Sequence, residues 1–114
     1  MNTKILGVLV LSALALPAVA QQAGNAQAAR AVNSACAGCH SIPGYQSSFP
    51  QVYRVPMIAG QSAKYIEAAL QAYKRGERNH PSMTAIALGL TDHQIADLAA
   101  YYAARGASTA VASK

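Results

Sequence analysis

The sequence has few of the residues that common metal sites and large hydrophobic cores require. Among 114 residues there are no Trp, one Phe and two Cys, and charged residues make up 11%. A structural zinc site needs four ligands, and two cysteines with His80 and His93 far away lack the spacing of a zinc finger. Because large aromatic side chains supply much of the volume of a core, this chain has little of its own with which to fill one.

Strand patterns and long basic runs are also missing. No alternating run of β-branched residues precedes Cys36, which argues against the βαβ context of a thioredoxin-type dithiol site and favours an all-α fold. The densest basic group is Lys74, Arg75 and Arg78, and Glu77 interrupts it. Such a group is typical of a solvated helix end, so we expect no nucleic acid among the partners.

The N-terminus has the pattern of an export signal. Lys4 precedes an apolar run over residues 5–16, Pro17 ends that run, and Ala18-Val19-Ala20 fits a signal-peptidase site. The apolar run falls short of the roughly 20 residues needed to span a bilayer as a helix. We therefore predict a cleaved signal peptide at 1–20, a domain over 21–106 and a flexible tail at 107–114, in a periplasmic protein without stable membrane insertion.

The strongest local signal is Cys36-Ala37-Gly38-Cys39-His40. Two thiols separated by two residues suit attachment to the two vinyl groups of one porphyrin, and the adjacent imidazole then meets the iron. A dithiol or metal site is the alternative, whereas a disulfide between these cysteines closes too small a loop to stabilise the chain much. We therefore predict one covalent haem c, whose burial supplies the volume that the side chains lack.

Helical periodicity marks the segments on either side of the haem motif. Residues 25–37 are rich in Ala and place Ala28, Val32 and Cys36 on one face, so they predict a helix that leads into the motif. Residues 62–75 predict a second helix, with Ser62 as its cap and Gly76 after its end. The apolar stripe of this second helix consists of Ile66, Ala69, Leu70 and Tyr73.

The last predicted helix covers residues 91–105. Thr91 and Gln94 have the spacing of a capping box, and Gly106 follows Arg105 as the expected stop. Its apolar stripe consists of Ile95, Leu98, Ala99 and Tyr102. Tyr73 and Tyr102 lie on the two stripes, so we expect both in the core.

Two long connections flank the middle helix, and we expect both to be irregular. Residues 41–61 contain Pro43-Gly44, Phe49-Pro50 and Pro56, and residues 78–90 contain Pro81. The second connection also carries Met83. A methionine on a loop between two helices is suited to approach an iron from the face opposite His40.

With these features placed, the chain resembles the class I c-type cytochromes, in particular single-haem relatives of the periplasmic dihaem cytochrome c-four group. The resemblance covers about residues 26–104 and implies a small all-α fold wrapped around the haem, with one-electron transfer as the activity. It rests on Cys36-Ala37-Gly38-Cys39-His40, Val55-Pro56-Met57-Ile58-Ala59-Gly60-Gln61, Tyr73-Lys74-Arg75-Gly76-Glu77-Arg78, Met83, Gly89-Leu90-Thr91-Asp92 and Ile95-Ala96-Asp97-Leu98-Ala99-Ala100-Tyr101-Tyr102.

The resemblance also implies a role for each matching site residue. Cys36 and Cys39 would form the thioether bonds, His40 would be the proximal ligand and Met83 the distal one. The Pro56 carbonyl would accept the Nδ1 hydrogen of His40 and orient its ring. Three rivals compete with Met83 for the iron: Met57, His80 and His93, of which His80 is the strongest because it lies three residues from Met83.

One stretch departs from the family pattern. Residues 41–54 lack the usual short glycine-rich continuation and insert Tyr45, Phe49, Tyr53 and Arg54 instead. Tyr53 or Arg54 is a candidate to bind a haem propionate, although loop residues of these types are more often exposed or packed.

These features favour a diffusible electron carrier. Without residues 1–20 the chain has eight basic and four acidic residues, a net charge of +4, and this excess suits redox partners with acidic docking surfaces. We expect a monomer and no enzymatic activity. The alternatives are an electron-accepting subunit of a periplasmic dehydrogenase, docked through the inserted residues, and a catalytic or gas-sensing haem with an open sixth position.

Overall fold

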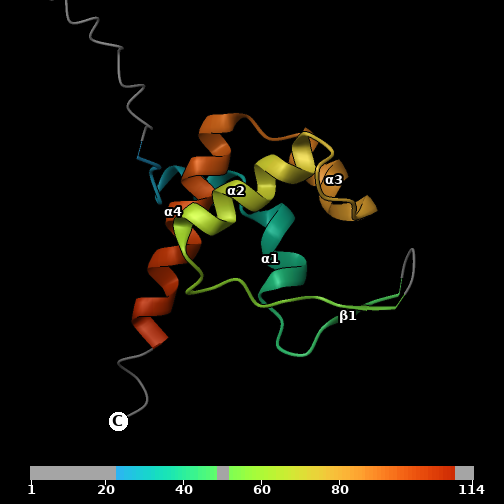
Figure 1. Cartoon of the computed structure of the whole chain (residues 1–114). Helices are drawn as coiled ribbons and strands as arrows, with labels where there is room; N and C mark the ends of the chain where they lie inside the picture. Colours follow the sequence, from blue (N-terminus) through green and yellow to red (C-terminus); the bar gives the residue numbers. More distant parts are fainter. Residues whose placement is uncertain (1–22, 49–51, 110–114) are drawn as a thin grey trace, which may run out of the picture.

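The computed structural model describes residues 23–48 and 52–109 of the chain. Helix α2 packs against both α3 and α4, and η1 packs against α4 (Figure 1). The predicted helical class is confirmed, whereas the predicted signal peptide at 1–20 lies outside the described residues. The elements in chain order are the 3-10 helix η1 (Ala28–Ala31), helix α1 (Ser34–His40), strands β1 (Gln46–Ser47) and β2 (Tyr53–Arg54), and helices α2 (Ala63–Lys74), α3 (Pro81–Leu88) and α4 (Asp92–Thr109).

Helix α4 carries the centre of the core. Ile95, Leu98 and Tyr102 are the largest fully buried side chains of the described residues, and each such apolar side chain contributes about 1.5–3 kcal/mol to folding. Burial raises the pKa of Tyr102 to about 12, so its hydroxyl stays protonated and donates a hydrogen bond of 2.5 Å to Asn33 Oδ1. The predicted core position of Tyr102 is therefore confirmed.

The prediction of one helix over residues 25–37 is wrong. The chain forms η1 and α1 instead, and Asn33 stands at the N-cap of α1. The Asn33 side chain donates to the Tyr101 hydroxyl at 3.3 Å and accepts from the Tyr102 hydroxyl. These bonds to α4 override the local helical preference of the Ala-rich segment, and the chain changes direction where they form.

Helix α2 forms where the sequence predicts it. The Ser62 hydroxyl accepts a hydrogen bond from the Tyr65 backbone N–H at 3.4 Å, and Gly76 has a φ of +76°, which residues with a side chain rarely adopt. At the end of the helix, Lys74 Nζ donates to the Leu90 carbonyl at 2.7 Å and to Asp92 Oδ1 at 2.8 Å. Lys74 thereby joins the end of α2 to the start of α4.

Helix α3 corrects the prediction of an irregular connection over residues 78–90. Pro81 occupies the first turn of this helix, where its missing N–H costs nothing and its fixed φ suits the helix. Pro81 therefore starts a helix and does not prevent one. Met83, expected on a loop, lies in the first turn of α3.

The short hairpin of β1 and β2 was also not predicted. The two strands pair antiparallel, with Gln46 opposite Arg54 and Ser47 opposite Tyr53, and Val55 N donates to the Tyr45 carbonyl at 3.0 Å. Figure 1 shows the hairpin extending away from the helices on the side of α1. Two residues per strand are too few to give an alternating pattern in the sequence.

Helix α4 does not stop at Gly106 as predicted but continues to Thr109. Its capping box is confirmed, because Gln94 N donates to Thr91 Oγ1 at 3.2 Å and Thr91 N donates to Gln94 Oε1 at 2.9 Å. Gly106 is instead the point at which α4 meets the chain at Gly60: a Cβ on Gly106 would lie 2.0 Å from the Gly60 Cα. The glycine permits a close crossing and does not end the helix.

This crossing gives a stability prediction. Gly106→Ala removes a helix-interior glycine, which alone would stabilise a helix by about 1 kcal/mol. The clash with Gly60 backbone outweighs that gain, and we expect the free energy of unfolding to fall by about 1–3 kcal/mol. Urea unfolding of the holoprotein measures the change. Gly89→Ala is the matched control, because a Cβ there finds only ordinary contacts, the nearest at 3.5 Å; equal stability of both variants would show that the crossing is not tight.

Candidate functional site

A cavity of about 320 Å³ lies between α1, α2, α3 and the segment over residues 55–58. We call it the central cavity. Apolar side chains from α2, α3 and α4 form most of its wall, and the residues expected to hold a cofactor lie along it. These lining residues include Cys36, Cys39, His40, Pro56, Met57, Ile58, Ile66, Leu70, His80, Met83, Ile86, Leu98 and Tyr102.

Helix α1 brings the haem motif to one wall of this cavity. Cys36 and Cys39 are three residues apart on a helix, so their side chains share one face; Cys36 is buried and Cys39 is half-buried. The two cysteines do not form a disulfide with each other. Before a cofactor is attached, burial raises the pKa of the Cys36 thiol.

His40 is the last residue of α1, and a hydrogen bond to the backbone fixes its ring. His40 Nδ1 lies 2.7 Å from the Pro56 carbonyl oxygen. Since a carbonyl only accepts hydrogen bonds, Nδ1 carries the hydrogen, and in the neutral ring this leaves the lone pair on Nε2. This is the tautomer of an imidazole that is ready to bind a metal through Nε2.

Met83 reaches the same cavity from α3. It is half-buried, packs against the core and lines the wall, as His40 does. The rival Met57 also lines the cavity but is 50% exposed and directly follows Pro56. Its neighbour Pro56 is already in contact with the ring of His40, so Met57 belongs to the His40 side of the site.

The two histidine rivals lie in different places. His80, at the N-cap of α3, lines the central cavity, and its Nδ1 is buried without a hydrogen-bond partner among the described residues. His93 does not belong to the cavity wall; its Nε2 lies 3.6 Å from Asp97 Oδ2 on the next turn of α4. The structure therefore brings His40, Met57, Met83 and His80 together at the cavity and leaves His93 apart.

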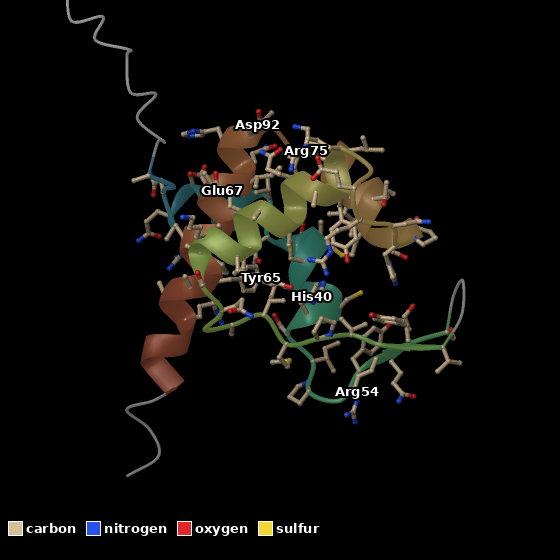
Figure 2. All side chains as sticks on the ribbon, viewed as in Figure 1. His40, Arg54, Tyr65, Glu67, Arg75 and Asp92 are labelled. Atoms are coloured by element: carbon tan, nitrogen blue, oxygen red, sulfur yellow. The ribbon has the colours of Figure 1, made fainter. Side chains whose placement is uncertain are left out.

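Of the two candidates to bind a haem propionate, one lies at this cavity. Tyr53 lines the cavity, whereas Arg54, the next residue on β2, does not. Figure 2 shows Arg54 on the outer side of the hairpin, well away from His40. A different arginine, Arg78, lines the cavity; the sequence placed it only in a solvated helix end, and no local pattern distinguishes it from Arg75.

These residues fit a covalently bound haem. The wall is mostly apolar, as a porphyrin ring requires, and one helix presents two thiols and an imidazole with a free Nε2. A thioether from α3 lines the same cavity, and the buried His80 Nδ1 offers an unused polar atom. Two thiols, one imidazole and one thioether form a donor set typical of a c-type haem.

Comparison with known proteins leads to the same family. A family model described as "Cytochrome c" matches residues 25–103. The chain is 40% identical over 86 residues to cytochrome c-554(548) of Halomonas halodenitrificans, an alignment that covers 73% of this chain and 99% of that protein. It is 34% identical over 105 residues to a cytochrome c4 of Pseudomonas aeruginosa, covering 92% of this chain but only 50% of that protein.

A further relative is named as part of a larger assembly. The chain is 40% identical over 67 residues to the cytochrome subunit of sulfide dehydrogenase of Chlorobaculum tepidum, which covers 59% of this chain and 56% of that subunit. The chain thus spans nearly the full length of the Halomonas protein and about half the length of the other two.

Proposed function

Since the chain belongs to the cytochrome c family, we propose that it is a periplasmic one-electron carrier whose haem iron is ligated by His40 and Met83. Its membership means that it carries one covalent haem c, has the helical fold of that family and transfers electrons without being an enzyme. The observation that carries the proposal is the 2.7 Å contact between His40 Nδ1 and the Pro56 carbonyl, at a cavity that Met83 also lines.

Each site residue has a defined task in this proposal. Cys36 and Cys39 bind the cofactor through thioether bonds, which hold it on the face of α1. The Pro56 carbonyl fixes the His40 ring and raises the basicity of Nε2. The bound haem supplies a ferric–ferrous couple.

Met83 determines what the site excludes. If both His40 and Met83 bind the iron of the haem, the protein would leave no coordination position open to a substrate or a gas. A thioether also favours the ferrous state more than a second imidazole does, which suits a carrier that must be reduced by its donor. The apolar wall of the cavity would exclude water from a haem bound there.

The direct test is carbon monoxide binding combined with a redox titration. The reduced wild-type protein should show no spectral change under carbon monoxide, and the titration should fit one electron per chain. A carbon monoxide adduct in the wild type at neutral pH would mean an open sixth position, and the carrier proposal would then give way to a catalytic or sensing haem.

Export to the periplasm rests on the sequence of residues 1–20. Among the described residues, none of the helices combines the length and hydrophobicity that crossing a membrane requires. We propose that cleavage after Ala20 releases a mature chain beginning at Gln21. N-terminal sequencing of the protein from a periplasmic fraction tests this, and recovery of the intact N-terminus from the membrane fraction would contradict it.

The proposed partners are redox proteins with acidic docking surfaces. The excess of basic over acidic residues should speed encounters with such a partner, and screening weakens the attraction as the Debye length falls from about 30 Å at 0.01 M to about 10 Å at 0.1 M salt. We expect the second-order electron-transfer rate constant to fall several-fold over that range in stopped-flow measurements. A neutral small-molecule oxidant is the control, and a salt-independent rate with the protein partner would favour apolar docking.

A second candidate function is that of a haem c subunit that accepts electrons within a periplasmic dehydrogenase. Two observations favour it: one relative is named as such a subunit, and Ile42 and Val52, in or beside the hairpin, are 45% and 73% exposed. Exposed apolar side chains of this kind suit a permanent partner. Gel filtration of a periplasmic extract separates the two functions, because a carrier elutes as a monomer and a subunit elutes with the enzyme.

A further inference from the structure

A polar pocket adjoins the central cavity where the inserted hairpin meets the start of α3. We call it the rim pocket. It shares part of its wall with the central cavity, so the two are continuous, and it adds Asn79 and Pro81. The shared residues are Tyr53, Tyr73, Arg78 and His80.

Arg78 supplies a fixed positive charge to this pocket. Its guanidinium donates to the Tyr65 hydroxyl at 3.5 Å and lies 4.9 Å from the centre of the Tyr73 ring. The hydrogen bond to Tyr65 raises the pKa of Arg78, and Tyr53 lies close enough to contribute. These neighbours are tyrosines and not carboxylates, so they orient the guanidinium without forming an ion pair with it.

Tyr53 and His80 also line the rim pocket. Their rings meet edge to face, with centroids 5.1 Å apart. Tyr53 comes from β2, so this strand of the hairpin contributes to the wall of the rim pocket. His80 brings a buried Nδ1 that has no hydrogen-bond partner among the described residues.

A phenol, a guanidinium and an imidazole that converge at the edge of an apolar cavity are donors for a carboxylate. The propionates of a haem lie on the half of the porphyrin remote from its vinyl groups. With Cys36 and Cys39 holding the vinyl side at α1, the propionates of a bound haem would lie toward walls formed by other elements. The rim pocket is a wall of that kind, formed by the hairpin and the start of α3.

We propose that Arg78 and Tyr53, supported by His80, form a carboxylate-binding site for a haem propionate, and that the inserted hairpin serves to complete this site. The inference rests on the proposed function, because it requires a haem attached at Cys36 and Cys39. It assigns the guanidinium to Arg78 and not to Arg54, whose side chain lines neither pocket.

The experiment compares holoproteins with Arg78→Gln, Tyr53→Phe, Arg78→Lys and, as a matched control, Arg54→Gln. Arg54→Gln removes the same charge from the residue next to Tyr53. The first readout is the propionate bending band in the resonance Raman spectrum of the reduced protein. We expect Arg78→Gln and Tyr53→Phe to shift this band and Arg54→Gln to leave it unchanged.

The second readout is the reduction potential. A nearby positive charge disfavours the ferric state, so Arg78→Gln should lower the potential, Arg78→Lys should restore most of it, and Arg54→Gln should have a much smaller effect. Equal shifts in Arg78→Gln and Arg54→Gln, or a propionate band that neither Arg78→Gln nor Tyr53→Phe moves, would overturn the assignment.

The same samples separate this inference from the function on which it rests. The covalent haem and the sulfur-to-iron absorption band are scored first in the wild type. If both are present and neither Arg78→Gln nor Tyr53→Phe shifts the propionate band, only the rim pocket proposal fails. If the wild type lacks the covalent haem or the sulfur-to-iron band, the proposed haem site itself is wrong.

Discussion

Replacing Cys36 and Cys39 together by Ala should give a chain without covalent haem that does not fold stably. Both thiols lie on α1 at the wall of a cavity of about 320 Å³. At about 24 cal/mol per Å³, leaving such a cavity unfilled costs on the order of 8 kcal/mol, which is comparable to the 5–15 kcal/mol that stabilises a typical domain. The core has no Trp to compensate.

Mass spectrometry after denaturation and acid extraction measures attachment, and circular dichroism measures the helix content. The wild type should retain the mass of one haem, and the double variant should lack both that mass and most of its helical signal. Ser34→Ala, at an exposed position of the same helix, is the control and should match the wild type. A wild-type chain without the haem mass and with two alkylatable thiols would contradict the covalent site.

The helices that the sequence predicted well are those with local signals at both their ends and their faces. Ser62 and Gly76 bound α2, and Thr91 with Gln94 starts α4, so the local sequence and the packed structure agree there. The prediction that α4 stops at Gly106 is wrong because a glycine that ends a helix and a glycine that permits a close crossing look alike in the local sequence. Only its contact with Gly60, which is remote in the sequence, distinguishes the two roles.

Helix α3 was not predicted from the sequence, for a different reason. Its apolar residues Met83, Ile86 and Leu88 do not form a single stripe, so the periodicity that reveals α2 is missing. A proline at position 81 predicts irregular structure, but the first turn of a helix also accepts proline. The sequence therefore identified Met83 as a candidate but placed it on the wrong kind of element.

The site residues that lie close together in the sequence were predicted, whereas those that are far apart in the sequence were harder to predict. Cys36, Cys39 and His40 lie within five residues, and their chemistry follows from that spacing. The partner of His40 Nδ1 is 16 residues away, and the family pattern was needed to suggest Pro56. The sequence suggested Tyr53 as a propionate ligand, but its neighbours Arg78 and His80 were not predictable, because the three residues meet only when the hairpin and α3 are placed in space.

The final prediction concerns the sixth ligand. Met83→Ala should abolish the weak long-wavelength sulfur-to-iron band of the oxidised protein and allow carbon monoxide to bind the reduced haem. The reduction potential should fall by on the order of 0.1 V, since axial ligands set haem potentials over a range of about 0.8 V. Visible absorption spectra and a redox titration of the holoprotein measure these changes.

Two variants test the rivals of Met83. Met57→Ala should keep the band and the potential, because Met57 is half exposed and follows the proline whose carbonyl contacts His40. His80→Ala should also keep the sulfur-to-iron band, because in our assignment His80 faces a propionate and not the iron. Two results would show that Met83 is not the ligand. One is a sulfur-to-iron band that survives in Met83→Ala and is lost in Met57→Ala, and the other is carbon monoxide binding in His80→Ala alone.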